Sequence, residues 1–237
     1  PTAAWQFDLR RAGFRTFTTG KTDANYRPMP EEYRRVLFHE DVLAEDAGRR
    51  GPLTEYLDRG PGIAGVNGPN DDGSADATFY DYSVAQNAID YLGRADPARR
   101  HLIQLGFKHP HYNLVCPDRF YQMYDAAAIT WPASAHPDDF TGPQPGMAVY
   151  ELAYIVNGAW TPEKAGDEGW RQVVRGYFAA CSHVDHEIGR FMQALRASKL
   201  GDCTTVVLLS DNGFNLGTHD SFHKMSQWDS AAHVPLG

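Results

Sequence analysis

The strongest constraint on the fold is a helical pattern followed at once by an apolar, β-branched run. Residues 170–197 predict one long amphipathic helix, because apolar side chains recur every three or four positions. The predicted apolar stripe consists of Tyr177, Cys181, Val184, Ile188, Phe191 and Leu195. Gly201-Asp202 then turns the chain into residues 204–210, whose composition is typical of a strand buried on both faces. This junction predicts a parallel sheet, since helices that lead into such strands build α/β proteins.

Two earlier segments show the same alternation of helix and strand. Residues 5–12 carry apolar side chains at helical spacing, Gly13 follows as a typical helix end, and residues 14–19 have strand character. Residues 78–92 predict a second helix, and residues 101–107 predict a buried strand. We therefore expect an α/β fold with a mostly parallel sheet flanked by helices.

Two irregular excursions interrupt this alternation. Residues from about 26 to 74 are rich in Pro, Gly, Asp and Arg, and prolines punctuate residues 132–146. We expect both segments to run over the surface with at most short helices, as loops that shape a substrate pocket do. From its length alone, the chain of 237 residues, with these excursions included, is expected to form about one to two domains.

Charge and hydropathy exclude several classes of partner. The chain has a formal net charge of −8, whereas binding to nucleic acid or to an anionic membrane needs a basic face. An anionic substrate must therefore be held by a local cluster of cations. Purely apolar runs such as residues 206–209 are too short to span a membrane.

The residues that follow the predicted strand at 204–210 carry oxygen ligands. Asp211 and Asn212 come directly after it, and Gly213 permits a tight turn. In parallel sheets, functional groups gather where the strands end at their carboxyl edge. A carboxylate next to a carboxamide suits Ca²⁺ or Mg²⁺ rather than zinc. The alternative is a plain turn, because Asp-Asn-Gly is also a common turn sequence.

The next stretch is dense in groups that bind anions, and it supports a family resemblance. Ser-Asp-Asn-Gly-Phe-Asn-Leu-Gly-Thr-His begins at residue 210, Lys224 follows, and Trp-Asp-Ser-Ala-Ala-His-Val-Pro-Leu begins at residue 228. Gly20-Lys21 and Lys108-His109-Pro110-His111 each follow an earlier predicted strand. Together these motifs resemble the sulfatase family of the alkaline-phosphatase superfamily, in particular its iduronate-sulfatase-like branch.

The resemblance implies catalytic and metal-binding roles. Asp211 and Asn212 would be ligands of a divalent cation, usually Ca²⁺ in this family, with Mg²⁺ as the alternative. Lys21 would contact the sulfate near the nucleophile, Lys224 would reach a sulfate oxygen, and His111 would bind sulfate beside the leaving-group oxygen. Fixed cations and a proton donor suit this reaction, because negative charge moves to the bridging oxygen as the S–O bond breaks. Taken alone, either lysine would be interpreted as a solvated surface residue.

Three more residues are candidates for substrate binding, namely Lys108, His109 and His219. His109 stands where many relatives have Lys, so it would supply positive charge. The alternative is that His109 packs or forms a hydrogen bond inside its loop while His111 binds the sulfate. For His219, a structural hydrogen bond is an equal alternative.

One part of the sulfatase pattern is missing. Sulfatases carry Cys/Ser-x-Pro-x-Arg, whose first residue becomes the formylglycine nucleophile, and the 237 residues contain no such motif. Cys116-Pro117-Asp118-Arg119 is a near match with its proline one position early. We therefore expect a central and C-terminal part of one sulfatase catalytic domain, with the nucleophile in a preceding segment. Asp23 lies where relatives have a His, which leaves the substrate contacts there open.

The leading hypothesis is a sulfuric ester hydrolase that acts on a sulfated small molecule or carbohydrate through formylglycine and a divalent cation. This chain alone is expected to be inactive and to bind calcium weakly, since Ca²⁺ takes about six to eight oxygen ligands. The alternatives are a phosphodiesterase or phosphonate hydrolase of the same superfamily, and a catalytically inert sulfatase-like binding protein. Substrate identity, oligomeric state and compartment stay open. Periplasmic, secreted and lysosomal locations fit the resemblance. The three cysteines are odd in number and form no CxxC pair, so they leave the redox compartment undetermined and do not exclude a cytoplasmic location.

Overall fold

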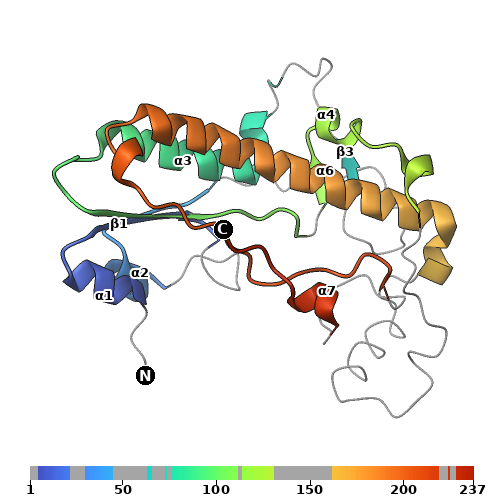
Figure 1. Cartoon of the computed structure of the whole chain (residues 1–237), viewed down its shortest axis with the longest axis horizontal. Coiled ribbons are helices and arrows are strands. Elements are labelled where there is room, and N and C mark those ends of the chain that lie inside the picture. The colour runs from blue at the N-terminus through green and yellow to red at the C-terminus, as the bar shows by residue number, and fades with distance from the viewer. Residues whose placement is uncertain are drawn as a thin grey trace, which may run out of the picture.

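A three-stranded sheet lies at the centre of the computed structural model (Figure 1). Its strands are β1 (Arg15–Gly20), β2 (Glu40–Val42) and β4 (His101–Gly106), which run parallel in the order β2-β1-β4. The middle strand β1 is fully buried at residues 16–19, whereas the edge strand β4 is mostly half-buried. The structure describes residues 5–21, 30–44, 63–65, 73, 76–111, 114–130, 162–218, 224 and 228–237.

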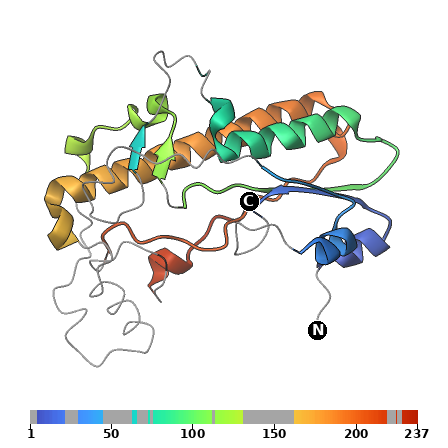
Figure 2. The ribbon, with the colours of Figure 1, turned by 180° about the vertical axis from the view of Figure 1, so that it is seen from behind.

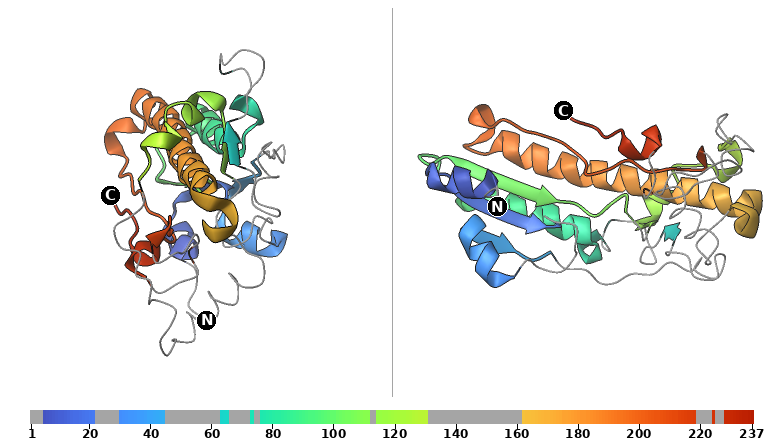
Figure 3. Two further views of the ribbon diagram at one scale, coloured as in Figure 1. Left: turned by 90° about the vertical axis from the view of Figure 1, so that its right-hand side faces the viewer. Right: turned by 90° about the horizontal axis from the view of Figure 1, so that it is seen from below.

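Helices cover both faces of this sheet. Figures 1 and 2 show α3 (Tyr80–Arg94) and α6 (Pro162–Ala197) side by side on one face, while α1 (Trp5–Arg11) and α2 (Glu31–Leu37) lie on the other. The helix α6 has 36 residues and runs most of the length of the molecule (Figure 3). Among the described residues, no helix combines the length and the apolarity that a membrane span requires.

The N-terminal half of α6 extends beyond the central sheet and packs against a second, smaller unit. This unit contains a two-stranded parallel sheet of β3 (Ile63–Gly65) and β5 (Leu114–Cys116), followed by the short helix α4 (Asp118–Tyr121). The remaining short helices are η2 (Asp76–Thr78), η3 (Ala126–Ala128), η4 (Gly201–Cys203) and α7 (Asp229–Ala232).

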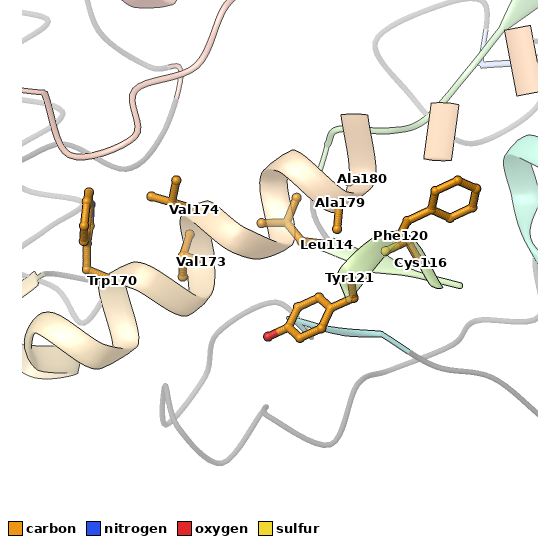
Figure 4. Close-up of a cluster of buried hydrophobic side chains, with 9 residues drawn as sticks. All are labelled: Leu114, Cys116, Phe120, Tyr121, Trp170, Val173, Val174, Ala179 and Ala180. Atoms are coloured by element: carbon orange, nitrogen blue, oxygen red, sulfur yellow. The ribbon is translucent and has the colours of Figure 1, made fainter. Parts of the chain in front are cut away.

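Two hydrophobic clusters hold α6 in place. In the first, Phe17 of β1 stacks on Tyr91 of α3 with ring centroids 4.3 Å apart, and Phe191 and Leu195 of α6 pack with them. The second cluster extends from Trp170 along α6 to the residues of β5 and α4 (Figure 4). It comprises Leu114, Cys116, Phe120, Tyr121, Trp170, Val173, Val174, Ala179 and Ala180. Full burial of one large apolar side chain contributes about 1.5–3 kcal/mol. The two clusters therefore anchor α6 at two places, at residues 170–180 and at residues 191–195.

The predicted fold class is confirmed, and most predicted elements are present. The helices predicted at 5–12, 78–92 and 170–197 are α1, α3 and α6. The strands predicted at 14–19 and 101–107 are β1 and β4, although β4 is less buried than expected because it lies at the edge of the sheet.

The excursion predicted at residues 26–74 contributes more to the fold than expected. It contains the short helix α2, in line with the prediction, but it also supplies β2, which pairs with β1 through Phe17↔Glu40 and Thr19↔Val42. A three-residue strand gives too little periodicity to be recognised among prolines and glycines. The excursion predicted at 132–146 lies outside the described residues, and the single-domain organisation stays a prediction.

The strand predicted at residues 204–210 is wrong. The segment is exposed, with Leu209 at 63%. Within the described part of the chain its backbone pairs with the last residues, where Leu208 and Gly237 exchange two N–H···O bonds of 2.9 and 3.0 Å beside an isolated antiparallel bridge from Leu209 to Leu236. One bridge is not a ladder, and a buried central strand needs parallel neighbours on both sides. The apolar composition of residues 204–210 therefore predicted a buried segment, but it could not show which strands would pair with it.

The buried face of α6 also differs from the predicted apolar stripe. Cys181, Val184 and Ile188, in the middle of that stripe, are half-buried. The fully buried positions at this level are His183 and Glu187, both with 0% exposure. An imidazole and a carboxylate thus occupy the place where the pattern predicted aliphatic side chains.

Candidate active site at the ends of the central strands

Lys21 follows the last residue of β1 and is held there by two glycines. Gly20 has φ +81°, a conformation that favours glycine, and it pairs with Gly106 at the end of β4. The Lys21 backbone N–H donates to the Gly106 carbonyl at 2.7 Å. A Cβ atom on Gly106 would lie 1.7 Å from the Lys21 carbonyl oxygen. The close approach of the two chains therefore depends on the absence of a side chain at position 106.

We expect Gly106→Ala to displace Lys21. The added methyl meets backbone that cannot turn aside, so the free energy of unfolding should fall by about 1–3 kcal/mol. If Lys21 has the catalytic role that the sequence predicts, activity of the full-length protein should fall by about 10²-fold, because misplacement of a catalytic group by about 1 Å has effects of that size. Urea unfolding and initial rates measure the two effects.

Gly93→Ala is the matched control for this substitution. Gly93 lies in α3, and a Cβ atom there meets nothing within 4 Å, so alanine should leave the stability unchanged or raise it slightly. Equal behaviour of the Gly93 and Gly106 variants would contradict the assigned role of Gly106.

The ammonium of Lys21 lies next to the carboxylate of Asp211. Lys21 Nζ is 3.7 Å from Asp211 Oδ2, and the side chain of Lys21 is 12% exposed while that of Asp211 is 63% exposed. Two residues that the sequence places 190 positions apart therefore meet at the carboxyl end of β1. An ion pair with one exposed partner contributes little to the free energy of unfolding. We therefore expect the two charges to matter for binding a ligand and not for the stability of the fold.

The turn that carries Asp211 and Asn212 is anchored by the segment around α7. The Gly213 N–H donates to the Ala231 carbonyl at 2.9 Å, and a Cβ atom on Gly213 would lie 2.1 Å from the Ser230 carbonyl oxygen. The glycine is thus required for close packing as well as for the turn. The exposed Asp211 and the half-buried Asn212 therefore lie in a turn whose backbone is held by these contacts.

The donor atoms of this turn fit a hard divalent cation. Asp211 offers carboxylate oxygens and Asn212 a carboxamide oxygen, which are ligands that Ca²⁺ and Mg²⁺ prefer. Lys21 beside them would be compatible with an anion bridging the ammonium and the cation. Two adjacent residues supply only part of the shell of about six to eight oxygens that Ca²⁺ takes.

The segment Lys108 to His111 leaves the sheet at the same edge as Lys21, because Gly20 and Gly106 are paired. The His111 N–H donates to the Lys108 carbonyl at 2.9 Å, which closes a turn. Lys108 and His111 are half-buried. Their side-chain roles in substrate binding and catalysis stay predictions.

His109 points into the interior. Its side chain is 7% exposed, and Nδ1 lies 2.8 Å from Asp81 Oδ2. This contact is made to α3 and not inside the loop of His109. A direct substrate contact of His109 stays a prediction. Lys224 is half-buried, and its convergence on Lys21 and Asp211 stays a prediction as well. His219 lies outside the described residues.

Asp81 is a residue of this region that sequence reasoning missed. It lies fully buried in the first turn of α3 and accepts backbone N–H bonds from Lys108 at 2.6 Å and from His109 at 3.1 Å. Burial alone would raise the pKa of Asp81, but the charge and hydrogen bond of His109 outweigh burial and bring the pKa down to about 2. The carboxylate therefore stays ionised and fixes the loop that carries His111. An acidic residue in a first helical turn is common, so the sequence held no signal of this contact.

Cys116, the near match to a nucleophile motif, is unsuited to that role. It lies in β5 with 0% exposure. Burial raises the pKa of its thiol to about 12, and the nearby charge of Asp118 acts in the same direction. A thiol with such a pKa is inert at neutral pH, in agreement with the sequence interpretation.

Comparison with known proteins places these residues in a family context. A family model described as Sulfatase matches residues 9–236. A protein named Sulfatase from Formosa agariphila is 32% identical over 134 residues, which are 56% of this chain and 26% of that protein. Iduronate 2-sulfatase of Homo sapiens is 27% identical over 169 residues, which are 68% of this chain and 30% of that protein. The chain thus spans less than a third of the length of either relative.

Solved structures share the fold over nearly the whole chain. The phosphonate monoester hydrolase from Silicibacter pomeroyi has a TM-score of 0.65 and 24% identity, and the match covers 99% of this chain and 52% of that chain. A protein solved in complex with its substrate D-glucosamine-2-N,6-O-disulfate has a TM-score of 0.63 and 17% identity, over 98% of this chain and 54% of that one. At these identities the likeness shows the fold alone.

Proposed function

This chain belongs to the sulfatase family, whose model matches residues 9–236, and from that premise we propose that the protein hydrolyses sulfate esters with the help of a divalent cation. The observation that carries the proposal is the contact of 3.7 Å between Lys21 Nζ and Asp211 Oδ2. Both residues were assigned to one sulfate site from separate motifs, so their meeting at one strand end supports a common role.

In this proposal the residues of the chain hold the sulfate group and compensate its charge. Asp211 and Asn212 bind the cation, which supplies positive charge to the sulfate oxygens when bound. Lys21, and Lys224 from the C-terminal loop, place ammonium groups against the remaining oxygens. Fixed charges of this kind lower the barrier because they face the oxygens on which negative charge develops.

His111 serves the leaving group in this proposal. It lies in the turn that Asp81 holds through the N–H groups of Lys108 and His109. From that position its imidazole would donate a proton or a hydrogen bond to the oxygen that departs from sulfur. The nucleophile is a formylglycine by family analogy, and it would come from a residue other than these 237, since they contain no Cys/Ser-x-Pro-x-Arg.

We propose a sulfated carbohydrate as the substrate class. Support comes from the solved structure of the same fold that holds D-glucosamine-2-N,6-O-disulfate and from the similarity to human iduronate 2-sulfatase. The acidic net charge of −8 is compatible with such a substrate only where a local cationic site overcomes it.

A second candidate function is hydrolysis of phosphonate or phosphate esters. The fold similarity to the phosphonate monoester hydrolase, with a TM-score of 0.65, favours it. A cation with two ammonium groups would hold a phosphoryl group as well as a sulfate, because both are tetrahedral anions.

Rates of hydrolysis of matched aryl esters by the full-length protein distinguish the two candidate functions. We expect turnover of an aryl sulfate with a kcat/KM at least about tenfold above that for the corresponding phosphonate monoester and phosphodiester, a difference of about 1.4 kcal/mol in transition-state stabilisation. A reversed preference would establish the second candidate. No turnover of any ester, by a protein that is folded by circular dichroism and loaded with Ca²⁺, would overturn both and favour an inert binding protein.

A further inference from the structure

A cluster of polar side chains is buried where α3, α6 and the loop of residues 108–111 meet. Asp81 comes from α3, His109 from the loop after β4, and His183 from the middle of α6. Asp81 and His183 have 0% exposure, and one ligand atom from each of the three residues lies within 4.8 Å of the others. Phe79 and Phe120 pack against the His183 ring with centroids 5.3 and 5.4 Å away. Two aromatic rings therefore line part of the cluster.

Nitrogen and oxygen atoms of the three side chains lie close together in this cluster. His109 Nδ1 lies 2.8 Å from Asp81 Oδ2 and 3.2 Å from His183 Nδ1. A single proton on His109 Nδ1 can point to the carboxylate or to the second ring, but not fully to both. Around a tetrahedral zinc ion with bonds of about 2.1 Å, neighbouring ligand atoms are about 3.4 Å apart. The spacing of the two imidazole nitrogens is close to that value, whereas the contact to Asp81 would have to lengthen by a few tenths of an ångström to admit a cation.

The far side of the His183 ring carries a second, independent indication. Within the described part of the chain, His183 Nε2 and Glu187 Oε1 are buried without a hydrogen-bond partner, and they lie 3.8 Å apart. The other Glu187 oxygen is held by Arg190 at 2.6 Å. A histidine that binds a metal usually donates its other ring N–H to a carboxylate. Glu187 stands where that carboxylate belongs once Nδ1 is engaged by an ion.

We propose that Asp81, His109 and His183 bind one divalent transition-metal ion of the zinc class, with Glu187 orienting His183. Nitrogen ligands distinguish this site from the all-oxygen site proposed at Asp211 and Asn212, since Ca²⁺ and Mg²⁺ take oxygen ligands. The ion would join α3, α6 and the loop that carries Lys108 and His111. This site is independent of the proposed sulfatase reaction and supports the loop from behind.

A neighbouring group of Asp76, His186 and Glu187 also has ligand atoms within 4.8 Å of one another. It is a weaker candidate, because both oxygens of Asp76 are held by Arg119 at 2.8 and 2.5 Å. His186 is exposed as well. The two groups share Glu187 as a neighbour, so the tests below are directed at His183 and Asp81.

The test uses the full-length protein after treatment with a strong chelator. Titration with Co²⁺ should produce the visible absorption of four-coordinate Co²⁺ and saturate at one equivalent, and Zn²⁺ should abolish the absorption by displacement. Elemental analysis of the protein as purified should find one zinc-class ion per chain. These two measurements need no variant, so they decide the proposal even where a buried substitution prevents folding.

Variants then assign the ion to its ligands. His183→Gln and Asp81→Asn should weaken Co²⁺ binding by at least about 100-fold, and Glu187→Gln by about 10–100-fold. The matched control is His101→Gln, because His101 lies in β4 and bonds Tyr91 and the Asp96 carbonyl rather than the cluster. This variant should bind Co²⁺ as the parent does.

Two outcomes would overturn the proposal. One is the absence of a stoichiometric Co²⁺ spectrum in the folded parent protein, which would leave a metal-free hydrogen-bonded chain of Asp81, His109 and His183. The other is an unchanged spectrum in His183→Gln. Asp211→Asn should keep the Co²⁺ equivalent, so failure of the oxygen site and failure of the buried site give different results.

Discussion

Replacement of Asp211 by Asn should lower kcat/KM of the full-length protein toward an aryl sulfate by at least about 10²-fold, which is the effect of removing one preorganised electrostatic group. The substitution keeps the shape of the side chain and removes the charge that lies 3.7 Å from Lys21 and is proposed to bind the cation. Because the Asp211 side chain is 63% exposed, the free energy of unfolding should change by no more than about 0.5 kcal/mol. Added Ca²⁺ should restore part of the activity at high concentration.

Asp202→Asn is the control for charge alone. Asp202 is exposed in η4, which follows α6 and not β1 or β4, so its neutralisation should leave both activity and calcium dependence unchanged. If the Asp211→Asn protein keeps full activity and the calcium dependence of the parent, the assignment of Asp211 as a metal ligand is wrong.

Replacement of Lys21 by Met should lower kcat by about 10²–10³-fold. Methionine keeps the apolar stem of a side chain that is only 12% exposed, so the packing against the strand ends should be nearly conserved. The loss should fall mainly on kcat, since the ammonium compensates charge that grows as the sulfate ester breaks.

Lys199→Met tests whether any lost lysine has this effect. Lys199 is exposed after the end of α6, and its removal should not change kcat. If Lys21→Met raises KM and leaves kcat intact, Lys21 contributes to uniform binding of substrate, and its assigned role in the transition state is wrong.

The meeting of Lys21 and Asp211 could be predicted from sequence for a physical reason. Each follows a segment with strand character, and a glycine lies close to each, directly before Lys21 at position 20 and two residues after Asp211 at position 213. Side chains at strand ends gather at one edge of a parallel sheet, so local patterns were enough to place Lys21. Asp211 reached the same place although residues 204–210 are not a buried strand, because the packing of Gly213 against Ser230 and Ala231 positions the turn.

Other features could not be predicted because they depend on partners that are distant in sequence. The composition of 204–210 indicates burial, but a strand assignment depends on which neighbours pair with it. His183 and Glu187 lie outside the predicted apolar stripe, and the sequence does not show that both are buried or that His183 contacts His109 beside Asp81. A His and a Glu four residues apart in the middle of a helix were the one signal available, and such a pair is also common at surfaces.

The most direct test of the proposed sulfate site is a double-mutant cycle on kcat/KM for an aryl sulfate, with Lys21→Met, Asp211→Asn and the double variant. If the ammonium and the cation bound by the carboxylate act on one sulfate group, the losses should be strongly non-additive, so that the double variant is little worse than the poorer single variant. Additive losses, with the double variant slower by the product of the two single effects, would show that Lys21 and Asp211 act independently and would contradict a shared site.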